Sequence, residues 1–139
     1  MKILFAFLLS CTGISAIAQD SWKVCLDKTV LLNTSTEDAE KNVVKISSSG
    51  LKKGKTFIVR YNEATPQKGW ERTITAYDEK DNELKTQTGK KFTLKTSELK
   101  SLLDKYKTIK IYTINSPTDP KMKSQVRLRR VHLCTLVLQ

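Results

Sequence analysis

The segment TFIVRY, residues 56–61, decides the fold class, because its apolar and polar side chains alternate. Phe57, Val59 and Tyr61 fall on one face of a strand, since successive side chains in a strand point to opposite sides. The same period of two returns in WERTITAY, residues 70–77, and in shorter stretches on either side. The chain is therefore predicted to consist mainly of half-buried antiparallel strands.

Working outward from this segment, we expect seven to nine short strands joined by polar turns. The candidate strands are residues 22–26, 29–32, 43–46, 56–61, 70–77, 83–87, 91–95, 108–114 and 125–138. Residues 29–32 are interpreted as the first strand continuing after a bend. In the last strand the apolar alternation changes parity at Arg129 and Arg130, which predicts a β-bulge near Arg129.

The helical period appears once, near residues 97–106. Four side chains there fall on one face of a helix, at i, i+3, i+4 and i+7: Leu99, Leu102, Leu103 and Tyr106. Thr96 or Ser97 is the expected N-cap. The whole pattern predicts an all-β protein, an antiparallel β-sandwich of immunoglobulin-like size with this short helix capping one open end. Barrel closure is the alternative.

Residues 1–18, MKILFAFLLSCTGISAIA, have the layout of a secretory signal peptide that ends in an A-x-A cleavage site. Its removal would leave residues 19–139 as a single β-sandwich domain. The alternatives are an uncleaved membrane anchor and a lipoprotein acylated at Cys11. The apolar run is interrupted and the A-x-A site lies downstream of Cys11, so both are disfavoured. We expect an exported protein, periplasmic or secreted, with no transmembrane span.

Cleavage would also leave two cysteines, Cys25 and Cys134, in an oxidising compartment. Two cysteines allow one intramolecular pairing, so a Cys25–Cys134 disulfide is predicted. Such a bridge would join the first strand to the last. In the chain-entropy model, closing a loop of about 100 residues contributes roughly 4.7 kcal/mol. The alternative is a pair of buried free thiols.

The chain has 25 Lys and Arg against 14 Asp and Glu, a formal net charge of +11. Spread-out positive charge can serve solubility alone, or it can attract an anionic surface such as lipid headgroups or acidic polysaccharide. Nucleic acid is not expected, because no recognition motif is visible. Candidate contact residues for a ligand or partner are Trp70, which begins its strand after a loop, and the cluster Arg127, Arg129 and Arg130.

Catalysis by a thiol or serine nucleophile would depend on His132, the only histidine. A thiol enzyme would use His132 with Cys134, and the predicted disulfide removes that nucleophile. A serine triad would need the same histidine, and no G-x-S-x-G elbow is present. The acidic residues, which could form a glycosidase pair, are concentrated in predicted loops and turns. No catalytic residue is therefore assigned.

Metal and cofactor sites are not expected either. His132, Cys134 and Met122 are a partial blue-copper set, but such sites need a second histidine. Residues 78–83 offer oxygen ligands without the twelve-residue calcium-loop pattern. These observations favour a non-enzymatic interaction or structural module of the bacterial cell envelope that binds a protein or an anionic glycan. The alternative is a small exported hydrolase or thiol enzyme using His132 with Cys134 or a carboxylate.

Overall fold

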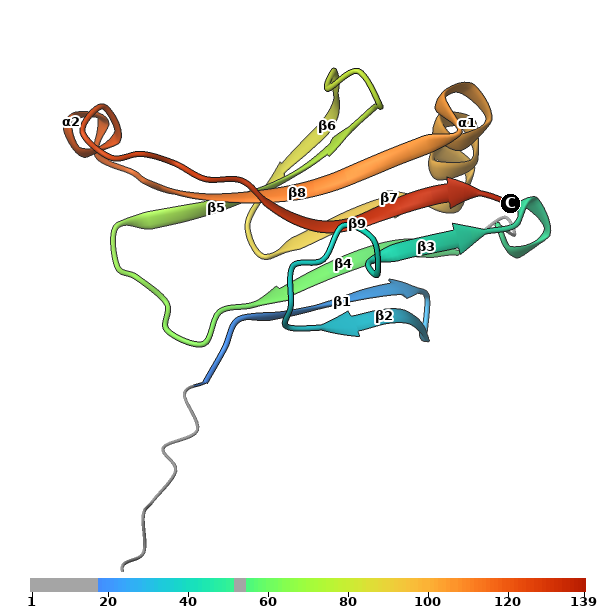
Figure 1. The fold of residues 1–139 in the computed structure, drawn as a ribbon, viewed down its shortest axis with the longest axis horizontal. Helices are drawn as coiled ribbons and strands as arrows, with labels where there is room; N and C mark the ends of the chain where they lie inside the picture. Colours follow the sequence, from blue (N-terminus) through green and yellow to red (C-terminus); the bar gives the residue numbers. More distant parts are fainter. Residues whose placement is uncertain (1–17, 52–54) are drawn as a thin grey trace, which may run out of the picture.

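A computed structural model describes residues 18–51 and 55–139 and has two sheets packed together (Figure 1). The fold is therefore the predicted all-β sandwich with a short helix. Except for Ala18, the expected signal peptide lies outside the described residues, and so does Cys11; export stays a prediction. None of the helices in the described ranges is long and apolar enough to cross a bilayer.

The four-stranded sheet has the order β2-β1-β4-β7 and is antiparallel throughout. Its strands are β1 (Ser21–Leu26), β2 (Thr29–Thr34), β4 (Thr56–Asn62) and β7 (Lys91–Lys95). The five-stranded sheet has the order β3-β9-β8-β5-β6. Its strands are β3 (Val43–Ile46), β5 (Trp70–Tyr77), β6 (Glu83–Thr88), β8 (Thr108–Pro117) and β9 (Val131–Leu138). β3 pairs with β9 in parallel, whereas the other described pairs are antiparallel.

The core lies between the two sheets and follows the alternation seen in the sequence. Phe57 and Val59 are fully buried, whereas Arg60 beside them is exposed. Inward-facing side chains of both sheets make up the core; its fully buried members include Val24, Phe57, Val59, Ile74, Ala76, Phe92, Ile109, Ile111 and Leu136. Burial of these apolar surfaces is the main force that holds the sheets together.

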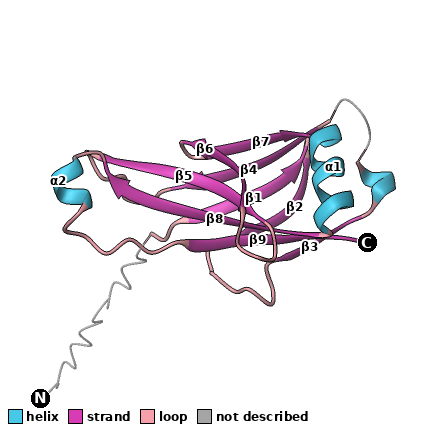
Figure 2. Ribbon diagram, turned by 90° about the horizontal axis from the view of Figure 1, so that it is seen from above, coloured by secondary structure: helices cyan, strands magenta, loops and turns pink. Residues whose placement is uncertain are grey.

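The helix α1 (Thr96–Tyr106) covers one end of the sandwich, as predicted (Figure 2). Leu99 and Leu103 on its inner face are fully buried. The predicted N-cap is wrong: Lys95 occupies that position, and its side chain makes no capping hydrogen bond. Thr96 lies inside the helix, where its hydroxyl donates to the carbonyl of Lys55 at 3.1 Å. A 3₁₀ turn, η1 (Ser48–Gly50), and the four-residue helix α2 (Pro120–Lys123) complete the described elements.

Two strand predictions are wrong in detail. β2 does not continue β1 but folds back on it as a hairpin, because Asp27 adopts a left-handed conformation with φ 52°. The last strand begins at Val131, so residues 125–130 lie outside the ladder. The irregularity in its register lies at Leu133, where the consecutive residues Ile111 and Tyr112 pair with Cys134 and His132. The expected bulge near Arg129 is therefore displaced into the strand.

The predicted Cys25–Cys134 disulfide is not present in the structure, in which both thiols are free and buried. Cys25 pairs with Ile58, between the inward-facing Phe57 and Val59, so its side chain points to the outer face of the four-stranded sheet. Cys134 pairs with Ile111 and belongs to the core. The backbone of the four-stranded sheet therefore separates the two thiols.

Candidate functional site

Three basic side chains form a row across the outer face of the four-stranded sheet. Lys23 on β1 pairs with Arg60 on β4, and Arg60 pairs with Lys91 on β7. All three are exposed, because the residues beside them on their strands point inward: Trp22 beside Lys23, Val59 beside Arg60 and Phe92 beside Lys91. Neighbouring strands lie about 4.8 Å apart, so this basic row spans roughly 10 Å.

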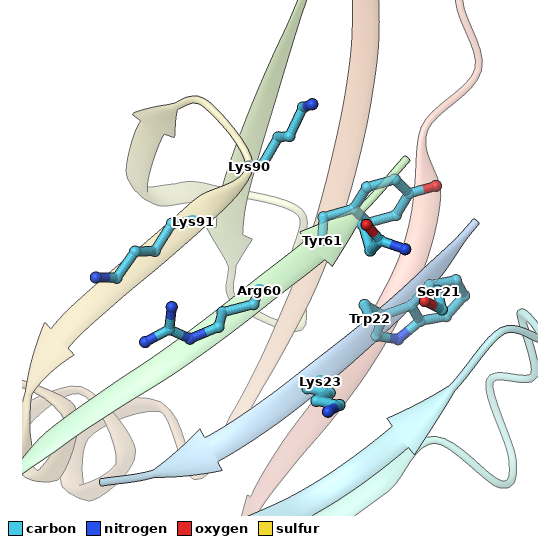
Figure 3. A pocket seen from close by; sticks show the side chains of 8 residues that line it. Ser21, Trp22, Lys23, Arg60, Tyr61, Lys90 and Lys91 are labelled. Carbon is cyan, nitrogen blue, oxygen red and sulfur yellow. The ribbon is translucent and has the colours of Figure 1, made fainter. Parts of the chain in front are cut away.

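The basic row lines a hollow of about 550 Å³ (Figure 3). The other residues of this basic hollow are Lys90, Ser21, Asn62, Trp22 and Tyr61. None of the described residues that line it is acidic. A second hollow of about 610 Å³ continues along the same face, where Lys28, Lys55 and Lys91 are joined by Asp27. The outer face of this sheet therefore presents positive charge over both of its ends.

Within the described part of the chain, the basic row makes no ion pair. Lys90 beside it lies 3.5 Å from a carboxylate oxygen of Glu63. Like charges directly opposite each other on paired strands destabilise a sheet. Three unpaired cations side by side on three strands therefore cost stability, and an anionic ligand would remove that cost.

An aromatic pair supports the row from inside. Trp22 stacks on Tyr61 with ring centroids 5.9 Å apart and planes 6° apart. The indole N–H of Trp22 donates to the carbonyl of Leu133 in the other sheet at 2.8 Å. Because Trp22 precedes Lys23 and Tyr61 follows Arg60, this pair fixes the strands that present both cations.

A buried ion pair lies behind the aromatic pair. Arg72 donates from Nε to Glu63 at 2.8 Å, and their side chains are 8% and 10% exposed. The Arg72 guanidinium carbon lies 3.9 Å from the centre of the Tyr61 ring, a cation–π contact. The Tyr61 hydroxyl donates to Asp20 at 2.8 Å. Burial and this hydrogen bond raise the pKa of Tyr61 to about 12, so the hydroxyl stays protonated.

The contact residues predicted from the sequence lie away from the basic row. Arg129 pairs with Glu37. Arg130 donates to both carboxylate oxygens of Asp81, at 2.8 and 3.0 Å, and covers the rings of Tyr77 and Tyr112. These two arginines thus have intramolecular partners.

Of the remaining two predicted contacts, Trp70 is half-buried at the start of β5, opposite Pro117, and Arg127 is exposed. Sequence reasoning missed Lys23 and Arg60. Each stands at an outward position of an alternating strand, and that parity is the signal that could have found them. Their alignment with Lys91 depends on the strand register, which the sequence alone does not reveal.

His132 and Cys134 do not form a catalytic pair. His132 pairs with Tyr112 and packs on its ring, on the outer face of the five-stranded sheet, whereas Cys134 points into the core. His132 Nε2 shares a 2.8 Å hydrogen bond with Thr135, and its buried Nδ1 has no hydrogen-bond partner among the residues that the structure describes. Burial raises the pKa of the Cys134 thiol, which disfavours a thiolate. No group of three His, Cys, Asp or Glu side chains in the described ranges is placed to hold a metal ion.

Burial of His132 should make the protein less stable in mild acid. Burial lowers the pKa of His132 below its ordinary 6.5, and Lys110 lowers it further, while Glu37 opposes the shift. Between the two pKa values the unfolded chain binds more protons, so stability is complete above the unfolded pKa and is lost as pH falls below it. Urea unfolding at pH 7.5 and pH 5 should show this loss, and His132→Gln should reduce it. An equal pH dependence in the variant would contradict the prediction.

The chain matches no family model and no curated protein sequence. The structure offers a sheet face on which three cations lie side by side over a hollow.

Proposed function

We propose that the protein is an exported, non-enzymatic binding module of the cell envelope whose basic face binds an anionic glycan. The observation that supports this most directly is the basic row of Lys23, Arg60 and Lys91. It forms no ion pair with a described residue, and none of the described residues that line its hollow is acidic. A linear polyanion lying across the strands would meet the three cations in turn. Clustered charge of one sign also attracts such a ligand from a distance.

The expected recognition is by charge rather than by stacking on sugar rings. Trp22 and Tyr61 line the basic hollow, but they are only 3% and 7% exposed and already stack on each other. Their ring faces are therefore occupied. Because sheet strands hold the backbone of the three cations in place, only their exposed side chains remain to be ordered when a ligand binds, at about 0.5–1.5 kcal/mol each.

Neutralising the basic row should weaken binding of a polyanion about 10- to 100-fold. The test is the triple variant Lys23→Gln, Arg60→Gln and Lys91→Gln. Three exposed ionic contacts of roughly 0.5–1 kcal/mol each give this range. Calorimetric titration with polygalacturonate, an acidic glycan, would measure it. Binding by the unmodified protein should also fall steeply as salt is raised.

The matched control removes three exposed charges elsewhere, by Lys41→Gln, Lys45→Gln and Lys100→Gln. Both triple variants lower the net charge equally, so only a localised site distinguishes them. If the two variants lose affinity to the same extent, the net charge of +11 explains the binding and the proposed site is wrong. Binding that survives molar salt would contradict an electrostatic mechanism.

A further inference from the structure

A projecting tip lies at the end of the molecule opposite α1 (Figures 1 and 2). The tip consists of residues 118–128, between β8 and β9, and contains α2. Its fold is held locally: the Asp119 carboxylate accepts from the amide of Lys121, and the amides of Gln125 and Val126 donate to the carbonyl of Met122. The tip is therefore a compact turn with a defined surface.

That surface combines apolar and basic side chains. Met122 is 44% exposed and Leu128 is 36% exposed; in the described chain they are two of the three exposed large hydrophobic residues. Three exposed cations lie in the same short segment: Lys121, Lys123 and Arg127. None of them forms an ion pair with a described residue. Asp119 is the only acidic residue of the tip, and it serves as the cap of α2.

We infer that the tip docks on a lipid surface, with Met122 and Leu128 entering the interfacial region and the three cations contacting anionic headgroups. Apolar side chains flanked by Lys and Arg suit this boundary, where apolar burial and headgroup charge both contribute. A protein partner fits less well, since a standard interface uses about 20–30 residues a side and the tip is much smaller. A fluid bilayer needs no complementary pocket.

The tip lies at the same end of the sandwich as the basic hollow. β1 begins and β4 ends at this end, and Trp22, Lys23 and Tyr61 line the hollow there (Figure 1). A tip docked on a membrane would therefore bring this end of the basic face near the anionic surface. The inference goes beyond the proposed function and does not depend on it, because the tip residues take no part in the basic row.

The test is co-sedimentation of the purified protein with vesicles of phosphatidylglycerol and phosphatidylcholine, and with vesicles of phosphatidylcholine alone. The unmodified protein should bind the mixed vesicles and bind the neutral ones far less. The variant Met122→Ser, Leu128→Ser should lose about tenfold in binding to the mixed vesicles, because it removes the two apolar side chains that would be buried in the membrane interface. Val30→Ser is the matched control, since Val30 is an exposed hydrophobic residue, 52% exposed, on β2.

The outcomes separate this inference from the proposed function. Loss of vesicle binding in the tip variant, with unchanged binding of polygalacturonate, would support the tip as a lipid-docking site even if the basic row proved inert. Equal vesicle binding by the tip variant and the unmodified protein would overturn the inference and leave the proposed function standing. Equal binding to neutral vesicles would overturn the part assigned to Lys121, Lys123 and Arg127.

Discussion

Replacing Arg72 with methionine should lower the free energy of unfolding by about 3–5 kcal/mol, because it removes the buried partner of the Glu63 carboxylate and leaves only the half-exposed Lys90 beside it. Glu63 is 10% exposed and accepts from Arg72 at 2.8 Å. The substitution also removes the guanidinium from the face of Tyr61 and the 3.1 Å hydrogen bond to Thr113. Folded domains are stable by about 5–15 kcal/mol in total, so the loss should be evident in a urea unfolding curve.

Two further variants give this prediction its controls. Lys90 also pairs with Glu63, but at 3.5 Å and with half of its side chain exposed, so Lys90→Met should cost less than about 1 kcal/mol. Adding Glu63→Gln to Arg72→Met should recover part of the loss, because the remaining buried group is then neutral. The explanation fails if Arg72→Met and Lys90→Met are equally destabilising, or if the double variant recovers nothing.

The strands of this fold were predictable because their side chains alternate. For Arg72 the alternation predicts an inward-facing side chain but not the residue with which it pairs. In residues 70–77 the alternation puts Arg72 on the same face as Ile74 and Ala76, both fully buried in the structure. The pattern therefore marks an inward arginine. Its partner Glu63 stands in a loop without periodicity, and only the folded chain brings the two together.

The same alternation also argues against the predicted Cys25–Cys134 disulfide. In residues 22–26, Cys25 has the opposite parity to Trp22 and Val24, the two large apolar residues that point inward. An outward Cys25 cannot reach a cysteine in the core. The parity change near Cys134 obscured which face that residue takes, because the irregularity lies at Leu133 within β9.

The pairing of strands that lie far apart in the chain could not be predicted from the sequence. The parallel contact of β3 with β9 joins residues about ninety positions apart, and no local pattern specifies it. The basic row has the same origin, since Lys23, Arg60 and Lys91 become neighbours only through the register of three strands. The candidate site was therefore less predictable than the fold. The sequence shows how many basic residues there are, but it does not show that three of them lie side by side on one face of a sheet.

Replacing Trp22 with alanine should be as damaging as breaking the buried ion pair, with a loss of about 3–5 kcal/mol. Trp22 is 3% exposed and fills the core against Tyr61. Its indole N–H also joins the two sheets through the carbonyl of Leu133. Trp22→Phe should keep much of the packing and cost about 1–3 kcal/mol, because that carbonyl then loses its donor.

Trp70 provides the matched control for Trp22, because it is only half-buried. Trp70→Ala should cost clearly less than Trp22→Ala in the same urea titration, since less apolar surface is lost from the interior. Trp22→Phe should also weaken polygalacturonate binding if the aromatic pair holds Lys23 and Arg60 in position. If Trp22→Phe binds as tightly as the unmodified protein, the aromatic pair stabilises the sandwich but is not needed to position the basic row. Recognition would then depend on the three charges alone.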